Sequence, residues 1–255
     1  GPFTLLPGAV NVITTGVVWA QATSGGAAAS VDLLRFADTK AQALFDNCFK
    51  IINGPDAPDL TIQELDKRLI IYLSNSATSN NYKDAYNEKD PYITSGTDTA
   101  WKFQGYKLYQ LKDATVSSND LENKDKARLV GIYDNKDGVK KIINYYIGQD
   151  PNPNYWTPKE MVNGSDNGVQ HSIVVTTDLF SSGDPTLVNH KTYYYMAVAY
   201  GYNPGEVSSN PTNPSGYNLP YIGGRRNVKS YSAIPHIHKG ESGGTEIVGD
   251  YGDGP

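Results

Sequence analysis

The four histidines are the first residues to consider for metal binding or acid–base chemistry: His171, His190, His236 and His238. One residue separates His236 from His238, so an extended strand would place both imidazoles on one face. Two imidazoles are two ligands, whereas a zinc site uses three or four. Pro235 precedes the pair and favours the end of a strand. His236 and His238 are therefore candidate ligands only if a carboxylate from elsewhere completes the site, and we expect no bound metal.

Two motifs typical of metalloproteases and nucleotide-binding proteins are missing from the sequence. It has no His-Glu-x-x-His and no glycine-rich loop that ends in Gly-Lys-Ser/Thr. The carboxylates Asp120, Glu122 and Asp125 alternate with Lys124 and Lys126, which is typical of a solvated loop rather than an acid–base pair. We therefore expect no catalytic residue and no cofactor, and predict that the chain is not an enzyme.

The turn over residues 134–138 contains Asp134 and Asp137 at a spacing that resembles a calcium-binding loop. It lacks the further ligands and the terminal glutamate of such a loop. The sequence predicts instead a hairpin turn between strands over 127–133 and 139–147.

Tyrosine dominates the aromatic residues, with 19 tyrosines against 6 phenylalanines. Its large apolar ring and its hydroxyl, which tolerates water, suit β-strands with one wetted face. We expect most aromatic side chains to pack in and around a sheet core. The alternative is a sugar-binding platform, for which the candidates are Trp101, Tyr106, Tyr109, Tyr145, Tyr146, Tyr155 and Trp156.

The hydrophobic patterns that must position these side chains predict a mainly β chain with one helix. Residues 3–22 are rich in β-branched residues and indicate a β segment. Residues 30–49 carry an apolar stripe at helical spacing, and this stripe includes Cys48, the only cysteine. We expect Cys48 to be buried rather than reactive. Prolines and a glycine within residues 53–58 end the helix.

The remaining chain alternates between strand patterns and loops. Strands are predicted over 59–65, 68–73, 103–111, 127–133, 139–147, 171–176, 192–200 and 227–234. Polar insertions are expected over 74–100 and 149–168. We therefore divide the chain into residues 1–52, a sandwich over 53–238, and a linker or extended tail over 239–255.

Charge and hydropathy limit the partners. The net charge is −5 and is spread along the chain, whereas a phosphate-binding surface is basic, so we expect no nucleic acid. No segment approaches the roughly 18 apolar residues of a membrane span. The first residues lack the pattern of a signal peptide, and both ends are expected to be cuts in a longer polypeptide.

The strand order resembles a fibronectin type III domain. Members of this family open with a proline and an apolar alternation, here residues 58–62, and carry Gly-Tyr-x-aliphatic-Tyr on the third strand, here residues 105–109. Leu187 and Tyr193 match the spacing before the next-to-last strand. The resemblance implies a fibronectin-III/immunoglobulin-like β-sandwich with long loop insertions, preceded by the β segment and the helix. It also implies that Tyr193 forms a tyrosine corner, in which the phenol bonds to upstream backbone.

A second resemblance extends over most of the chain. Residues 7–11, 40–49, 54–60, 103–111, 189–195 and 223–227 are similar to large Bacteroidota proteins exported by the type IX secretion system. This implies an extracellular or outer-membrane location, a C-terminal sorting domain outside this chain, and partners among secretion or outer-membrane components and other domains of the same polypeptide. Residues 98–100 resemble the O-glycosylation signal of such proteins, which makes Thr99 a candidate modification site.

Together these patterns predict a non-catalytic structural or interaction module of a secreted or cell-surface protein. The alternative is a carbohydrate- or surface-binding module accessory to an extracellular hydrolase, with glycans as partners.

Overall fold

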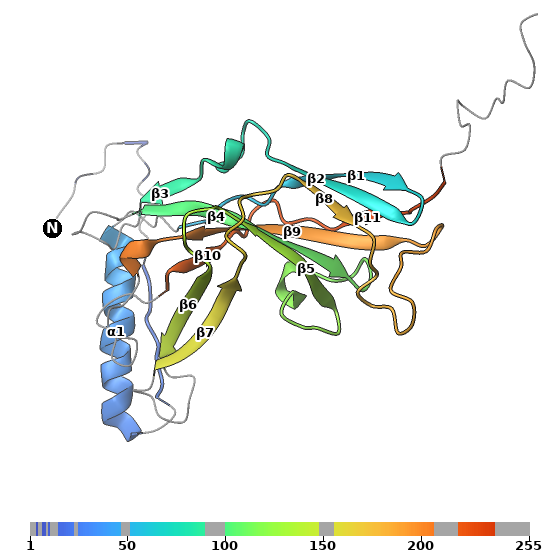
Figure 1. The fold of residues 1–255 in the computed structure, drawn as a ribbon. Helices are drawn as coiled ribbons and strands as arrows, with labels where there is room; N and C mark the ends of the chain where they lie inside the picture. The colour runs from blue at the N-terminus through green and yellow to red at the C-terminus, as the bar shows by residue number, and fades with distance from the viewer. Residues whose placement is uncertain are drawn as a thin grey trace, which may run out of the picture. The chain divides into compact units, whose positions relative to one another are not determined.

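The computed structural model describes residues 4, 7–8, 10, 15–22, 25–46, 52–89, 100–147, 156–206 and 219–237 (Figure 1). The chain divides into two compact units, residues 1–51 with 147–157 and residues 52–146 with 158–255. In the described ranges the strands pair into antiparallel sheets, and one α-helix precedes them. The expectation of a mainly β fold with one helix is therefore confirmed.

The helix of the first unit, α1, spans Gly26–Asp46 and so begins before the predicted start at residue 30. The run of alanines at 27–29 favours this earlier start, because alanine has the highest helix propensity. Ser30 lies inside the helix and donates its hydroxyl hydrogen to the carbonyl of Gly26 at 3.3 Å. Among the described residues, no helix is both long enough and apolar enough to cross a membrane.

The predicted apolar stripe of α1 is only partly sheltered. Val31, Leu34 and Phe45 are exposed, whereas Leu44 is half-buried. Cys48 lies outside the described residues.

Residues 15–22 belong to the predicted N-terminal β segment but form neither strand nor helix. Val17 is 98% exposed and Trp19 is 78% exposed. Residues of β-forming type become a strand only where a partner strand and a packing surface are present. The prediction is therefore wrong for residues 15–22, and most of residues 3–14 lie outside the described ranges.

The second unit contains a small sheet, a large sheet and a separate strand pair (Figure 1). The small sheet has the order β1-β2-β8, with β1 Asp59–Leu65, β2 Arg68–Ser74 and β8 Ser172–Val175. The large sheet has the order β10-β9-β4-β3, with β5 also paired to β4 and β11 also paired to β9. Its strands are β3 Asn87–Lys89, β4 Ala100–Leu111, β5 Ala127–Asp134, β9 Tyr193–Tyr202, β10 Tyr221–Gly223 and β11 Tyr231–Ala233.

The separate pair joins β6 Lys141–Ile147 to β7 Trp156–Asn163. Short 3₁₀ helices occur at Tyr82–Asp84, Ser118–Asp120 and Pro204–Glu206.

One apolar core lies between the small and large sheets. Every second residue of β2 is buried, so Leu69 and Ile71 point inward and are fully enclosed. From the large sheet, Tyr106, Leu108 and Tyr195 meet them with no exposed surface. Other members of this core include Trp101, Phe103, Ile173, Val175, Leu187, Tyr193 and Ala233.

The outer face of the large sheet is covered as well. On β9, Met196 packs against Leu111 and against Val116 of the loop after β4. Tyr200 packs against Ile142 of β6 and Val162 of β7. The strand pair β6–β7 therefore lies over the outer face, and the expectation that this face meets water is wrong at these positions.

The predicted hairpin at residues 134–138 is not formed, because β5 pairs with β4 whereas β6 pairs with β7. Side-chain bonds explain the difference. The carboxylate of Asp134 accepts the backbone N–H of Asp166 at 3.0 Å, and the carboxylate of Asp137 accepts the amide of Gln104 at 3.0 Å. These bonds hold the turn against β4 and the loop after β7, so β6 leaves the sheet.

Both predicted insertions contain ordered structure. Residues 149–168 include all of β7. Residues 74–100 include β3, the buried ring of Tyr86 and the fully buried Asn81. The final strand is shorter than the predicted 227–234, and β10 is an additional strand that the sequence did not indicate.

Candidate functional site

The predicted histidine pair is described only at His236. Its Nδ1 lies 2.9 Å from the carbonyl oxygen of Ile234 and 3.4 Å from a carboxylate oxygen of Glu64. His238 and the candidate modification site Thr99 lie outside the described residues. Within the described ranges, no group of three or more His, Cys, Asp or Glu side chains is placed to hold a metal ion.

Tyr193 and Leu187 lie at the corner that leads into β9. Tyr193 is 2% exposed and Leu187 is 1% exposed. The hydroxyl of Tyr193 accepts the backbone N–H of Val188 at 2.8 Å, so the phenol is the acceptor in this bond to upstream backbone. The ammonium of Lys191 lies over the same ring, 5.1 Å from its centroid. These contacts fix the path of the chain from residue 187 to residue 193.

The candidate sugar platform is divided by the fold. Trp101 and Tyr106 are buried in the core between the sheets and cannot stack on a ligand. Tyr109, Tyr145 and Tyr146 are half-buried. Tyr155 lies outside the described residues, and Trp156 begins β7.

A polar network surrounds the hydroxyl of Tyr106 at one rim of the core. This hydroxyl donates to the carboxylate of Asp84 and accepts the amide of Asn81 at 3.2 Å and that of Asn75. His171 Nε2 lies 2.7 Å from the other carboxylate oxygen of Asp84. Burial, and then the Asp84 carboxylate, raise the pKa of Tyr106 far above its ordinary value, so the phenol stays neutral. The network ties the loop after β2 to β4.

A His–Asp pair can activate a nucleophile, as in hydrolase triads. In the part of the chain that the structure describes, the imidazole of His171 hydrogen-bonds only to Asp84, and no serine, threonine or cysteine bonds to its second ring nitrogen. The backbone at Asp84 has a φ of 59°, a conformation that aspartate adopts more readily than most residues. This geometry supports a loop anchor.

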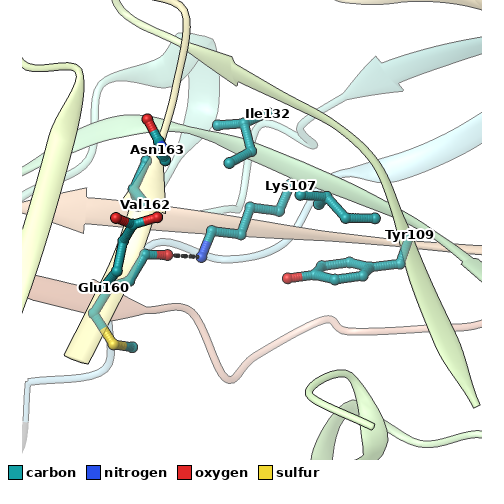
Figure 2. A pocket seen from close by; sticks show the side chains of 8 residues that line it. Lys107, Tyr109, Ile132, Glu160, Val162 and Asn163 are labelled. Atoms are coloured by element: carbon teal, nitrogen blue, oxygen red, sulfur yellow. Dashed lines mark hydrogen bonds between the residues drawn. The ribbon is translucent and has the colours of Figure 1, made fainter. Parts of the chain in front are cut away.

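A cavity of about 250 Å³ lies between β4, β5 and β7 (Figure 2). Alternation along β4 sends Tyr106 and Leu108 into the core between the sheets, and Lys107 and Tyr109 to the outer face. The cavity walls are Lys107, Tyr109, Leu129, Ile132, Glu160, Met161, Val162 and Asn163.

Lys107 is the unusual side chain of this cavity. It is only 8% exposed, and its ammonium donates to the carbonyl of Met161, a bond drawn in Figure 2 as the dashed line from Lys107. The ring centroids of Tyr221 and Tyr200 lie 4.6 Å and 5.5 Å from Nζ, within the range of cation–π attraction. Aromatic faces and one carbonyl thus replace the water around this charge.

Burial sets the electrostatics of the cavity. It lowers the pKa of Lys107 from 10.5 to about 8, with Glu122 partly opposing and Lys159 reinforcing the shift. Burial and the Glu122 carboxylate raise the pKa of Tyr109 to about 12. At neutral pH the cavity therefore presents a cation, with a minor fraction of neutral amine, beside a neutral phenol.

Sequence reasoning did not select Lys107, because it assumed that the outer face of β4 is wet. The available signal was a lysine flanked by Tyr106 and Leu108, with the aromatic Tyr109 next on the same face of the strand. A strand buried on both faces has such a pattern, and the layer that covers it comes from a distant segment.

Comparison of the chain with protein-family models, curated proteins and solved structures found no match.

Proposed function

We propose that the second unit is a fibronectin-III-like β-sandwich that serves as a non-catalytic structural or interaction module of a secreted or cell-surface multidomain protein. The observation that carries this proposal is the strand order. If β3, β6, β7 and β10 are counted as additions, seven core strands remain: β1, β2, β4, β5, β8, β9 and β11. The first, second and fifth of these form the small sheet β1-β2-β8, and the other four form β5-β4-β9-β11 in the large sheet. In immunoglobulin-like sandwiches the first, second and fifth strands share one sheet, and the third, sixth and seventh share the other, which supports the proposal.

The corner at Tyr193 supports the same assignment. A tyrosine at the start of the penultimate core strand, bonded to backbone a few residues upstream, is a recurrent feature of these sandwiches. Here Val188 N–H, Tyr193 Oη and the buried Leu187 occupy that place.

The structural role is supported by how buried polar groups are used. Asp178 is 3% exposed and accepts hydrogen bonds from Gln110, the Phe180 N–H and Lys191. Burial raises its pKa, but these donors outweigh burial, so its pKa is lowered and the carboxylate is ionised. Asp178, like Asp84, joins a loop to β4.

The strand order can be tested by cross-strand nuclear Overhauser contacts in solution. The proposal predicts contacts across Ile71 and Ile173, and across Tyr195 and Tyr231, which face each other in the register of β2 with β8 and of β9 with β11. Pairing of β8 with the large sheet instead would contradict a fibronectin-like division.

The functional part of the proposal can be tested on a glycan array with the full chain. A structural module should show no binding above background. The matched variant replaces Tyr72 and Tyr82, which are 39% and 42% exposed, by alanine. Glycan binding that this variant loses would contradict the proposal and assign the chain to carbohydrate recognition.

Export by the type IX system is the part of the proposal that rests on sequence resemblance. It predicts that the chain, joined to a sorting domain in a Bacteroidota host, reaches the cell surface and carries a glycan at Thr99. Mass spectrometry of the peptide that contains Thr99, with Thr99→Val as the control, measures this modification. Retention of the protein inside the cell would contradict the export assignment.

A further inference from the structure

We propose that the cavity on the outer face of β4 binds a small monocarboxylate with a short apolar tail, held by Lys107 and Tyr109. This binding site is additional to the structural role proposed above.

The ammonium of Lys107 is a buried cation without a counter-ion in the described chain. Lys107 is more than nine-tenths buried, and one carbonyl accepts one of the three hydrogens of its ammonium. Within the described residues, no carboxylate lies at ion-pair distance from it. A buried charge without a counter-ion is costly, and a bound anion would remove that cost.

The nearby carboxylates of Glu160 and Glu122 already have lysine partners. Glu160 lies in the cavity wall, but its carboxylate is 2.7 Å from the ammonium of Lys141. Glu122 is 2.6 Å from the ammonium of Lys159. Their charges are therefore largely balanced at the rim, and the charge of Lys107 is left for a ligand.

A second hydrogen-bond donor, Tyr109, lines the same cavity as Lys107. The hydroxyl of Tyr109 makes no hydrogen bond within the described chain. In Figure 2 this hydroxyl and the amine of Lys107 point into the same space. An ionised carboxylate has two oxygens that only accept hydrogen bonds, so it matches one ammonium and one phenol.

The remaining walls select the rest of the ligand. Leu129, Ile132 and Val162 offer apolar surface to a hydrocarbon tail. The volume of about 250 Å³ holds roughly eight water-sized groups at about 30 Å³ each, which is the size of hexanoate. A single lysine and apolar walls suit a monoanion better than a phosphate, which requires more donors.

The test is isothermal titration of the full chain with hexanoate and with hexanamide, its neutral counterpart of the same shape. Hexanoate should bind saturably, and hexanamide about tenfold more weakly or worse, because hydrogen bonds to a charged group contribute about 1.5–3 kcal/mol. Binding should weaken as the pH rises through the pKa of Lys107, because only the ammonium form attracts a carboxylate.

Variants identify the groups responsible. Lys107→Met should reduce hexanoate affinity at least about tenfold, and Tyr109→Phe should reduce it several-fold. Lys112→Met is the matched control, because it removes an exposed lysine just after β4, and it should bind as the wild type does. Circular dichroism of each variant checks that the fold is retained. Methionine is chosen because its unbranched, flexible side chain can fill the space of the Lys107 side chain.

A free acid and the C-terminal carboxylate of a peptide share the proposed chemistry. A dipeptide that ends in leucine and the C-terminal amide of that dipeptide distinguish these sources. Only the dipeptide acid should bind, and if it binds more tightly than hexanoate, the site is assigned to the C-terminal ends of peptides. The proposal would be overturned by equal affinity for hexanoate and hexanamide, or by full hexanoate affinity in Lys107→Met. It would also be overturned if hexanoate did not saturate the protein by about 10 mM, because that concentration detects even a roughly 4 kcal/mol interaction.

Discussion

The two faces of the large sheet are both covered, but by different kinds of surface. The inner face meets the small sheet through side chains such as Leu69, Ile71 and Leu108, all fully buried and apolar. The outer face meets the β6–β7 pair through a cavity that contains Lys107. Close packing without charge stabilises a fold, whereas a cavity with an unneutralised cation lowers stability and provides a place for a ligand. The alternation of β4 thus separates the residues that hold the sandwich from those that form the proposed site.

The largest effect should come from the inner face. Leu108→Ala removes a fully buried side chain between the sheets and should lower the free energy of unfolding by about 2–5 kcal/mol, measured by urea denaturation. Leu129→Ala, on β5 and 45% exposed, is the control and should cost less than about 1 kcal/mol. Equal losses would mean that the outer layer contributes to stability as the inner core does.

The corner before β9 should give the next largest effect. Tyr193→Phe leaves the Val188 N–H without its acceptor and should cost about 1–3 kcal/mol of unfolding free energy. Tyr194→Phe, on the opposite face of the same strand, should cost about 0.5 kcal/mol or less. Comparing the urea midpoints of both variants decides the register, and a larger loss in Tyr194→Phe would show that the inward face of β9 is misassigned.

A smaller, pH-dependent effect is expected at the edge of the inner face. The Asp59 carboxylate on β1 accepts hydrogen bonds from Lys229, Asn227 and Tyr231, and chiefly the Lys229 bond lowers its pKa. Because the folded pKa lies below the unfolded one, this stabilisation is present above the unfolded value near 3.9 and is lost as the pH falls through the folded pKa.

Asp59→Asn should therefore lower the urea midpoint at pH 7 by the equivalent of less than about 1 kcal/mol, since the group is partly exposed. The difference from the wild type should narrow as the pH falls below about 4. Asp125→Asn, in the loop before β5, serves as the control. A difference that stays constant with pH would show that Asp59 contributes through its shape rather than its charge.

The sequence predicted the strands of the sandwich well, because their local alternation is strong. The patterns over 59–65, 68–73, 103–111 and 192–200 correspond to β1, β2, β4 and β9. Local pattern failed where distant contacts decide the structure. Residues 134–138 have the composition of a hairpin turn, but the bonds of Asp134 and Asp137 to Asp166 and Gln104 redirect the chain.

The candidate cavity could not be predicted for the same reason. Whether Lys107 is wet or buried depends on β7, whose Met161 lies 54 residues further along the chain in a segment expected to be an irregular insertion. Conversely, the residues that suggested chemistry by type, His171 and Asp137, make bonds that fix loops. The type of a residue indicates which chemistry its side chain can perform, and burial determines at which positions the pKa of that side chain is shifted.

The most direct test of this comparison is the titration of Lys107, followed through the chemical shift of its ε-carbon in the wild-type chain between pH 6 and 12. The assignment comes from the signal that Lys107→Met removes. If the β6–β7 layer desolvates the outer face of β4, the pKa of Lys107 will be about 8. A pKa near the ordinary 10.5 would place the amine in water and contradict both the covered outer face and the binding site proposed there.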